Sequence, residues 1–154
     1  MTPSEHAHLQ SRPAPLLVLW TLRGGSLLVV LLVLLQGALA GAFGTGDLNM
    51  LRLHSHNANI TFYAQSIVII GAVGLWWRGR GPQWPMWAAL ILLVAIGAQI
   101  ALGHRRVVEV HLPLSLLIFA AAVAFSAVMF VHRWRTSVAL PTAEIVPRTG
   151  EGAR

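Results

Sequence analysis

The stretch HSHNANITFYAQ, residues 54–65, leads directly into an apolar segment that ends at Trp77. It carries more polar and imidazole side chains than a membrane-spanning helix normally contains. A second histidine, His111, opens another apolar segment further along the chain. Histidines therefore lie at the start of two apolar segments, and the other apolar segments of the chain can be located relative to these two.

The composition indicates an integral membrane protein. Of the 154 residues, 56% are apolar and only 10% are charged, whereas a soluble domain of this size needs far more charged surface. All eleven basic residues are arginines, and the formal net charge is +6. The arginines flank apolar segments, so we interpret them as topology signals and lipid headgroup contacts and expect no nucleic-acid partner. Cysteine is absent, which excludes disulfides, thiolate metal sites and covalent c-type haem attachment.

Four apolar segments predict an all-α integral membrane protein, an up-down-up-down four-helix bundle. The predicted spans are about 26–43, 58–77, 86–103 and 112–131, each close to the length that crosses a bilayer. Together they form a transmembrane domain of residues 16–135. Disordered tails are predicted at 1–15 and 136–154, where proline and polar residues are frequent.

Two local signals set the expected ends of these spans. Arg23-Gly24-Gly25 interrupts the apolar residues that precede it, so we expect this triplet to stop the first segment. Pro113 is suited to the first turn of a helix, so we expect the fourth helix to begin at His111 or Leu112.

The first span can also be interpreted as a signal peptide. Arg23, the apolar run 27–35 and Ala38-Leu39-Ala40 together mimic a secretory leader that is cleaved after Ala40. An internal echo argues against cleavage, because the tetrapeptides at 36–39 and 99–102 both have the form Gln-x-Ala-Leu. Each is followed by a short loop and a span headed by histidine. A repeated helix pair implies that its first helix is retained.

The distribution of arginines predicts the orientation. Eight lie on the side of the two termini and of the loop after the second span, and three, Arg52, Arg105 and Arg106, lie on the other side. The positive-inside bias therefore predicts a multi-pass protein of the cytoplasmic membrane with both termini in the cytoplasm. It follows that the histidines at the heads of the second and fourth spans lie near the outer face, at one depth.

Two imidazoles at matched depth predict a haem site. A six-coordinate haem iron takes two facing imidazole nitrogens, and alternate helices of a bundle can supply them. Residues two apart on a helix point about 200° away from each other, so only one of His54 and His56 can face the haem. We favour His56, which is nearer the span, with His54 as the alternative and His111 as the second ligand. In the competing interpretation these histidines are ordinary polar residues at the membrane interface.

The buried amides have two possible roles. Gln36 and Gln99 fall within or near the outer third of the first and third spans, so they are expected to point into the bundle. There they would form interhelical hydrogen bonds or line a cofactor pocket.

The outer charged residues also admit alternatives. Arg52, Arg105 and Arg106 have the guanidinium geometry that suits haem propionates. Alternatively, Glu109 forms an exposed ion pair with Arg105 or Arg106, which would contribute little to stability. If residues 54–56 were extended, His54 and His56 would instead form an H-x-H pair for copper or zinc.

These landmarks resemble a known family. Gln-x-x-Leu-x-Gly near the end of the first span, Gln-x-x-Leu-Gly at the end of the third, and a histidine opening each following span are similar to one four-helix half of haem A synthase. The resemblance covers roughly residues 27–131 and implies haem ligation by His111 with His56 or His54. The chain has half the family's length, so two haem sites would require a homodimer. It lacks the cysteine pair of many members and the Glu-x-x-x-His before the second span. Small four-helix membrane proteins with the same landmarks are also similar.

The sequence therefore predicts a small membrane protein that binds b-type haem between its second and fourth helices, for electron transfer or haem handling. A cofactor-free scaffold or accessory subunit of a membrane complex is the alternative, and a haem-modifying oxidoreductase is a third interpretation. Besides the lipid bilayer, the expected partners are a second copy of the chain or a respiratory or haem-biogenesis membrane protein.

Reporter fusions test the predicted orientation. Fusions near Gly81 and at the C-terminus are expected to score cytoplasmic, and fusions near Asp47 and Arg106 are expected to score outside, because the arginine bias places them there. A C-terminus outside the cell, or a mature N-terminus at Gly41, would contradict the prediction.

Overall fold

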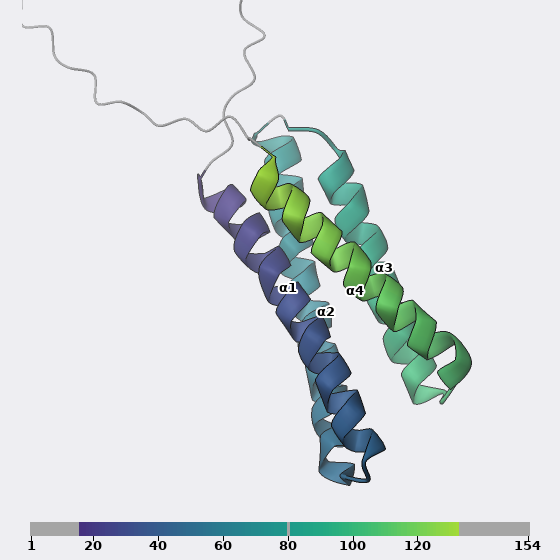
Figure 1. Cartoon of the computed structure of the whole chain (residues 1–154). Coiled ribbons are helices and arrows are strands. Elements are labelled where there is room, and N and C mark those ends of the chain that lie inside the picture. Colours follow the sequence, from purple (N-terminus) through teal and green to yellow (C-terminus); the bar gives the residue numbers. More distant parts are fainter. Residues whose placement is uncertain (1–15, 80, 133–154) are drawn as a thin grey trace, which may run out of the picture.

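The computed structural model describes residues 16–79 and 81–132, and this part of the chain consists of four helices joined by short turns (Figure 1). Their bounds are α1, Leu16–Gly44; α2, Leu48–Trp77; α3, Trp84–His104; and α4, Val108–Val131. The prediction of an all-α chain with four helices is confirmed. Each helix is long and apolar enough to cross a membrane, which is consistent with a multi-pass membrane protein. The predicted tails lie outside the described residues.

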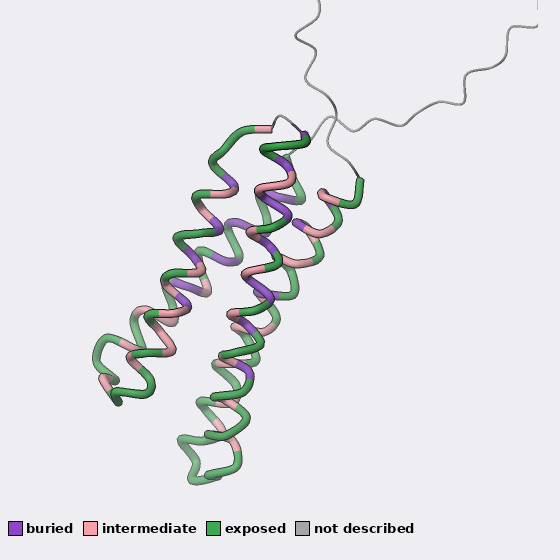
Figure 2. The backbone as a smooth tube through the Cα atoms, turned by 180° about the vertical axis from the view of Figure 1, so that it is seen from behind, coloured by how far each residue is buried: buried purple, intermediate pink, exposed green. Residues whose placement is uncertain are grey.

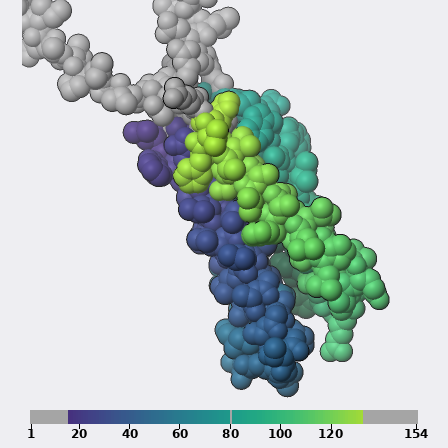
Figure 3. All heavy atoms as spheres, in the orientation of Figure 1, coloured from purple at the N-terminus to yellow at the C-terminus, as the bar shows by residue number. Residues whose placement is uncertain are grey.

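The helices alternate in direction and form a four-cornered arrangement. α1 and α3 each pack against α2 and α4, and the described residues show no direct backbone approach between α2 and α4, which are therefore diagonal. The hairpins α1–α2 and α3–α4 lie close together at one end and diverge toward their connecting turns at the other (Figure 1). Buried residues are concentrated in the closed half (Figure 2), and the surface is hollowed between the hairpins at the divergent end (Figure 3).

The outside of the bundle is apolar. Large hydrophobic side chains are exposed along all four helices, including Leu17, Ile70, Ile91 and Leu116, which are each at least 69% exposed. Such a continuous apolar surface would be costly in water. It matches the hydrocarbon of a bilayer, where helices satisfy their own backbone groups.

The buried faces of the two hairpins repeat each other. One constant sequence offset relates α2 to α4 and a second relates α1 to α3, so that residues at matching positions are buried in both hairpins. The matched buried pairs are Thr61 and Ile118, Gln65 and Ala122, Val68 and Phe125, Ser26 and Ala89, and Val29 and Leu92. The same offsets relate His54 to His111 and Gln36 to Gln99. The internal echo therefore extends beyond the tetrapeptides to much of the buried face.

Hydrogen bonds join the neighbouring helices inside this core. The fully buried Gln65 donates through Nε2 to the carbonyl of Ala89 at 2.8 Å, joining α2 to α3. The hydroxyls of Ser26 and Ser126 lie 3.2 Å apart and join α1 to α4. These bonds satisfy polar groups that would otherwise be stranded in an apolar interior.

α1 continues through Arg23-Gly24-Gly25, so the prediction that this triplet stops the first segment is wrong. The half-buried Arg23 donates through Nε to the carbonyl of Met129 at 3.0 Å, and its guanidinium lies 5.8 Å from the centre of the Phe130 ring. Both partners belong to the last turn of α4, where a cation is favourable against the helix dipole. Arg23 thus provides a hydrogen-bond donor to a backbone carbonyl in the last turn of α4, and α1 continues through this position without a break.

α2 and α4 also begin earlier than predicted. The Asp47 side chain caps α2 by accepting a hydrogen bond from the Asn49 N–H at 2.9 Å, so the helix begins at Leu48 and not near Ala58. α4 begins at Val108, which places Pro113 inside the helix and not in its first turn. The heads of both even-numbered helices therefore extend further toward the turns than the apolar residues alone indicate.

Two adjacent glycines test the packing of α1 on α2. A Cβ added at Gly25 would lie 3.0 Å from Cγ2 of the fully buried Val68, so Gly25→Ala is expected to destabilise the bundle by about 1–3 kcal/mol through overpacking. Gly24→Ala is the matched control, since nothing lies within 4 Å of the added carbon. It is expected to be neutral or stabilising by up to about 1 kcal/mol through helix propensity. Thermal unfolding in detergent measures both, and equal effects would contradict the close contact.

Candidate cofactor-binding site

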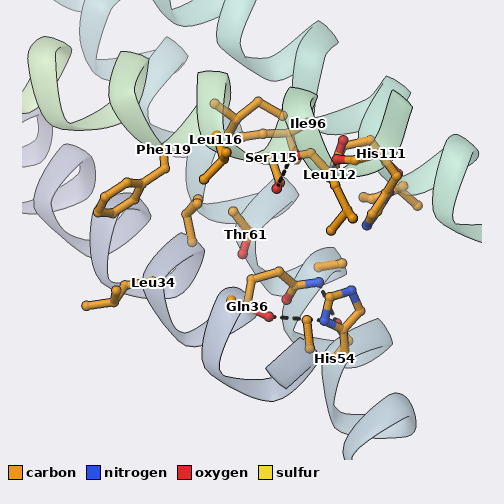
Figure 4. A pocket seen from close by; sticks show the side chains of 17 residues that line it. Leu34, Gln36, His54, Thr61, Ile96, His111, Leu112, Ser115, Leu116 and Phe119 are labelled. Atoms are coloured by element: carbon orange, nitrogen blue, oxygen red, sulfur yellow. Dashed lines mark hydrogen bonds between the residues drawn. The ribbon is translucent and has the colours of Figure 1, made fainter. Parts of the chain in front are cut away.

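His54 and His111 project toward each other across the divergent end of the bundle (Figure 4). His54 lies in the second turn of α2 and His111 in the first turn of α4. Their ring centres are 6.3 Å apart, and the ring planes are inclined by 51°. Two diagonal helices that do not pack directly therefore meet through these two side chains.

Each imidazole is held by the backbone carbonyl of a glutamine. Nδ1 of His54 lies 3.2 Å from the carbonyl oxygen of Gln36, and Nδ1 of His111 lies 3.1 Å from that of Gln99. A carbonyl oxygen can only accept a hydrogen bond, so Nδ1 carries the proton in both rings and Nε2 keeps its lone pair. Histidines that ligate metals are commonly oriented in this way.

The same glutamines bind the backbone of the histidines in return. Nε2 of Gln36 donates to the carbonyl of His54 at 3.0 Å, and Nε2 of Gln99 donates to the carbonyl of His111 at 2.8 Å. Each glutamine therefore forms two hydrogen bonds with one histidine, joining α1 to α2 and α3 to α4. These paired bonds fix the N-terminal turns of α2 and α4 against the neighbouring helices, and they fix the orientation of each imidazole ring.

The two halves differ in how the glutamine oxygen is satisfied. Oε1 of Gln36 accepts a hydrogen bond from Nδ2 of Asn57, which also donates to the carbonyl of Leu32 at 2.9 Å. Leu114 stands at the matching position of α4. Oε1 of Gln99 is accordingly buried with no hydrogen-bond partner among the described residues.

A cavity of about 260 Å³ lies beside the two rings and continues into a wider opening of about 790 Å³ near the turns. His54, His111, Gln36 and Gln99 line both. The remaining walls of the smaller cavity are mostly apolar and come from all four helices, with small residues such as Gly37, Ala40 and Ala58 and larger ones such as Val33, Ile96 and Phe119. An apolar cavity with a few converging polar groups is typical of a ligand-binding site.

His56 does not reach this cavity, and the expectation that it faces His111 is wrong. The preference for His56 assumes that the helix begins near Ala58. Since α2 begins at Leu48, both histidines are helical, and the register turns His54 toward His111 and leaves His56 exposed. The extended H-x-H arrangement is wrong for the same reason.

The three outer arginines occupy different environments. Arg52 and Arg105 are exposed and line neither cavity, whereas Arg106 lines the wider opening. The alternative in which Glu109 pairs with Arg105 or Arg106 is not observed, since these residues form no ion pair within the described chain.

Arg106 also has an unusual backbone. Its φ is 58°, and the N–H groups of Arg106 and Val107 bond back to the carbonyls of Gly103 and Leu102, each at 3.1 Å. This is a Schellman ending of α3, which normally places glycine in the left-handed position. The corresponding turn after α1 does so, with Gly46 at φ 104°. A non-glycine residue there costs roughly 1–2 kcal/mol.

Comparisons with protein-family models, with curated proteins and with solved structures find no match for this chain. The resemblance to the haem A synthase family therefore rests on its glutamine and histidine landmarks. In the structure, the landmark residues Gln36, His54, Gln99 and His111 come together around one cavity.

NMR of nitrogen-labelled imidazole rings tests the arrangement of the site. In the protein without added ligand, at mildly alkaline pH, His54 and His111 are expected to be in the Nδ1–H tautomer, because each Nδ1 faces a carbonyl oxygen. The exposed His56, which forms no hydrogen bond among the described residues, is the control and should resemble a solvated imidazole. An Nε2–H tautomer at His54 or His111 would contradict the geometry.

Proposed function

We propose that this is a small integral membrane protein that binds one b-type haem between His54 and His111. The facing imidazoles carry the proposal, because both expose an unprotonated Nε2 to the space between α2 and α4. Their ring centres are 6.3 Å apart. An iron held between two imidazoles needs a similar separation, with about 2 Å for each iron–nitrogen bond and roughly 1 Å from each nitrogen to its ring centre.

Haem suits this set of residues better than a bare metal ion. Zinc and copper sites generally use three or four protein ligands, and the described residues contain no group of three or more His, Cys, Asp or Glu that could hold a metal ion. A porphyrin brings four nitrogens of its own and needs only two axial ligands. The apolar walls of the cavity favour a flat, largely apolar ring system.

The proposed setting is the cytoplasmic membrane, with both termini in the cytoplasm. The arginine distribution supports this orientation, which turns the divergent end of the bundle and both histidines toward the outer face. Two axial histidines leave no open position on the metal for a substrate, which favours electron transfer or haem handling over oxidation of a bound substrate.

Absorption spectroscopy of the purified, detergent-solubilised protein tests the proposal. The wild type, titrated with haem, is expected to show a Soret band and an α band on reduction. His54→Ala and His111→Ala should each lose this spectrum, because the substitution removes an axial ligand. His56→Ala is the matched control from the same helical turn and should retain it. Circular dichroism of the haem-free variants reports whether they remain folded.

The possible outcomes separate the alternatives. Full haem binding by His111→Ala would overturn the site, and loss in His56→Ala with retention in His54→Ala would reverse the choice of ligand. A folded wild type that takes up no haem would favour the cofactor-free scaffold or accessory subunit.

A further inference from the structure

Arg106 occupies a position that favours glycine. In both turns at the divergent end, a residue with a left-handed backbone lies two positions after the last residue of the helix, α1 in one turn and α3 in the other. In the first turn that residue is Gly46, but in the second it is an arginine. Backbone strain at a single residue is commonly retained where the side chain has a function.

The Arg106 side chain is a cation beside an apolar space. It lines the wider opening together with His54 and His111. Among the described residues it forms no ion pair, and Glu109, the acidic residue in the following helix, does not pair with it. A guanidinium in this position can bind a carboxylate through two parallel hydrogen bonds.

We propose that Arg106 binds a carboxylate at the edge of the ligand held by His54 and His111. This inference rests on the proposed function and deepens it. It makes the ligand an amphipathic tetrapyrrole with free carboxylates, which point toward the turn between α3 and α4. The apolar edge of the ring system then lies deeper in the smaller cavity, among apolar side chains such as Val33, Ile96 and Phe119. Arg52 and Arg105, which line no cavity, have no part in this contact.

The same guanidinium chemistry could serve the phosphate of an anionic lipid, because the divergent end would lie near one face of the membrane. The two anions differ in what they depend on. A ligand carboxylate contributes only when the ligand is bound and is removed by esterification. A lipid phosphate stabilises the protein without ligand and is removed by using a neutral lipid.

A comparison of two ligands and two variants tests the inference. Haem and its dimethyl ester are titrated into the wild type, Arg106→Gly and Arg105→Gly, and the thermal unfolding of each ligand-free protein is measured. The titrations use neutral detergent and are repeated in nanodiscs with and without anionic lipid. Arg105 is the matched control because it is adjacent, exposed and has an ordinary φ of −82°.

Arg106→Gly is expected to raise the unfolding temperature by a few degrees, since glycine relieves the left-handed strain. It should nevertheless weaken the binding of haem by about five- to tenfold, because a charge-assisted contact is lost. The dimethyl ester should bind the wild type and Arg106→Gly equally. Arg105→Gly should leave haem affinity unchanged.

Other results would overturn the inference. Equal haem affinity in the wild type and Arg106→Gly would exclude the contact, and an equal loss for haem and its ester would mean that Arg106 acts only through the structure of the turn. An effect that appears only with anionic lipid, with no difference between haem and ester, would assign Arg106 to a lipid phosphate. If neither ligand binds the wild type, the proposed function itself fails.

Discussion

The paired hydrogen bonds between Gln36 and His54 and between Gln99 and His111 hold the divergent end of the bundle. Beyond the last buried residues of each hairpin, the helices share little packed core, and polar groups in an apolar environment must find partners within the protein. Each glutamine supplies one donor and one acceptor to its histidine. The same bonds therefore secure the helix heads and leave Nε2 of each ring free for a metal.

Most of the fold could be predicted because it depends on local composition, but the helix ends depend on particular contacts. From the sequence alone, Arg23-Gly24-Gly25 is expected to end a helix, because a charge and two glycines interrupt the apolar residues. The hydrogen-bond partner of Arg23 is the carbonyl of Met129 in the last helix, 106 residues further along the chain, and the local sequence does not reveal it. The early start of α2 was visible in principle, since Asp47 precedes the helix as a typical N-cap. The polar residues that follow Asp47 are unusual for a membrane span, and they favour the prediction of a later helix start.

The candidate site was predictable in its residue types and less so in its geometry. Gln36, Gln99 and His111 were recognised from their spacing, but the choice between His54 and His56 depends on where α2 begins and how it packs. The sequence offered Arg52, Arg105 and Arg106 equally as partners for haem propionates. Only the structure separates them, because Arg106 alone of these three lines the wider opening and has a left-handed backbone. A departure from the repeat is informative at Asn57 and Leu114, since Oε1 of Gln36 is satisfied while Oε1 of Gln99 has no hydrogen-bond partner among the described residues.

The ring centres of His54 and His111 lie 6.3 Å apart, and in the proposed complex one haem iron would bind both rings. Low-temperature EPR spectroscopy of the ferric, haem-loaded wild type distinguishes one axial histidine from two without relying on any substitution. Two imidazole ligands produce a low-spin iron, and this is the signal that we expect. A high-spin, five-coordinate signal from the wild type would show that only one of the two histidines binds, and it would contradict a haem held between α2 and α4.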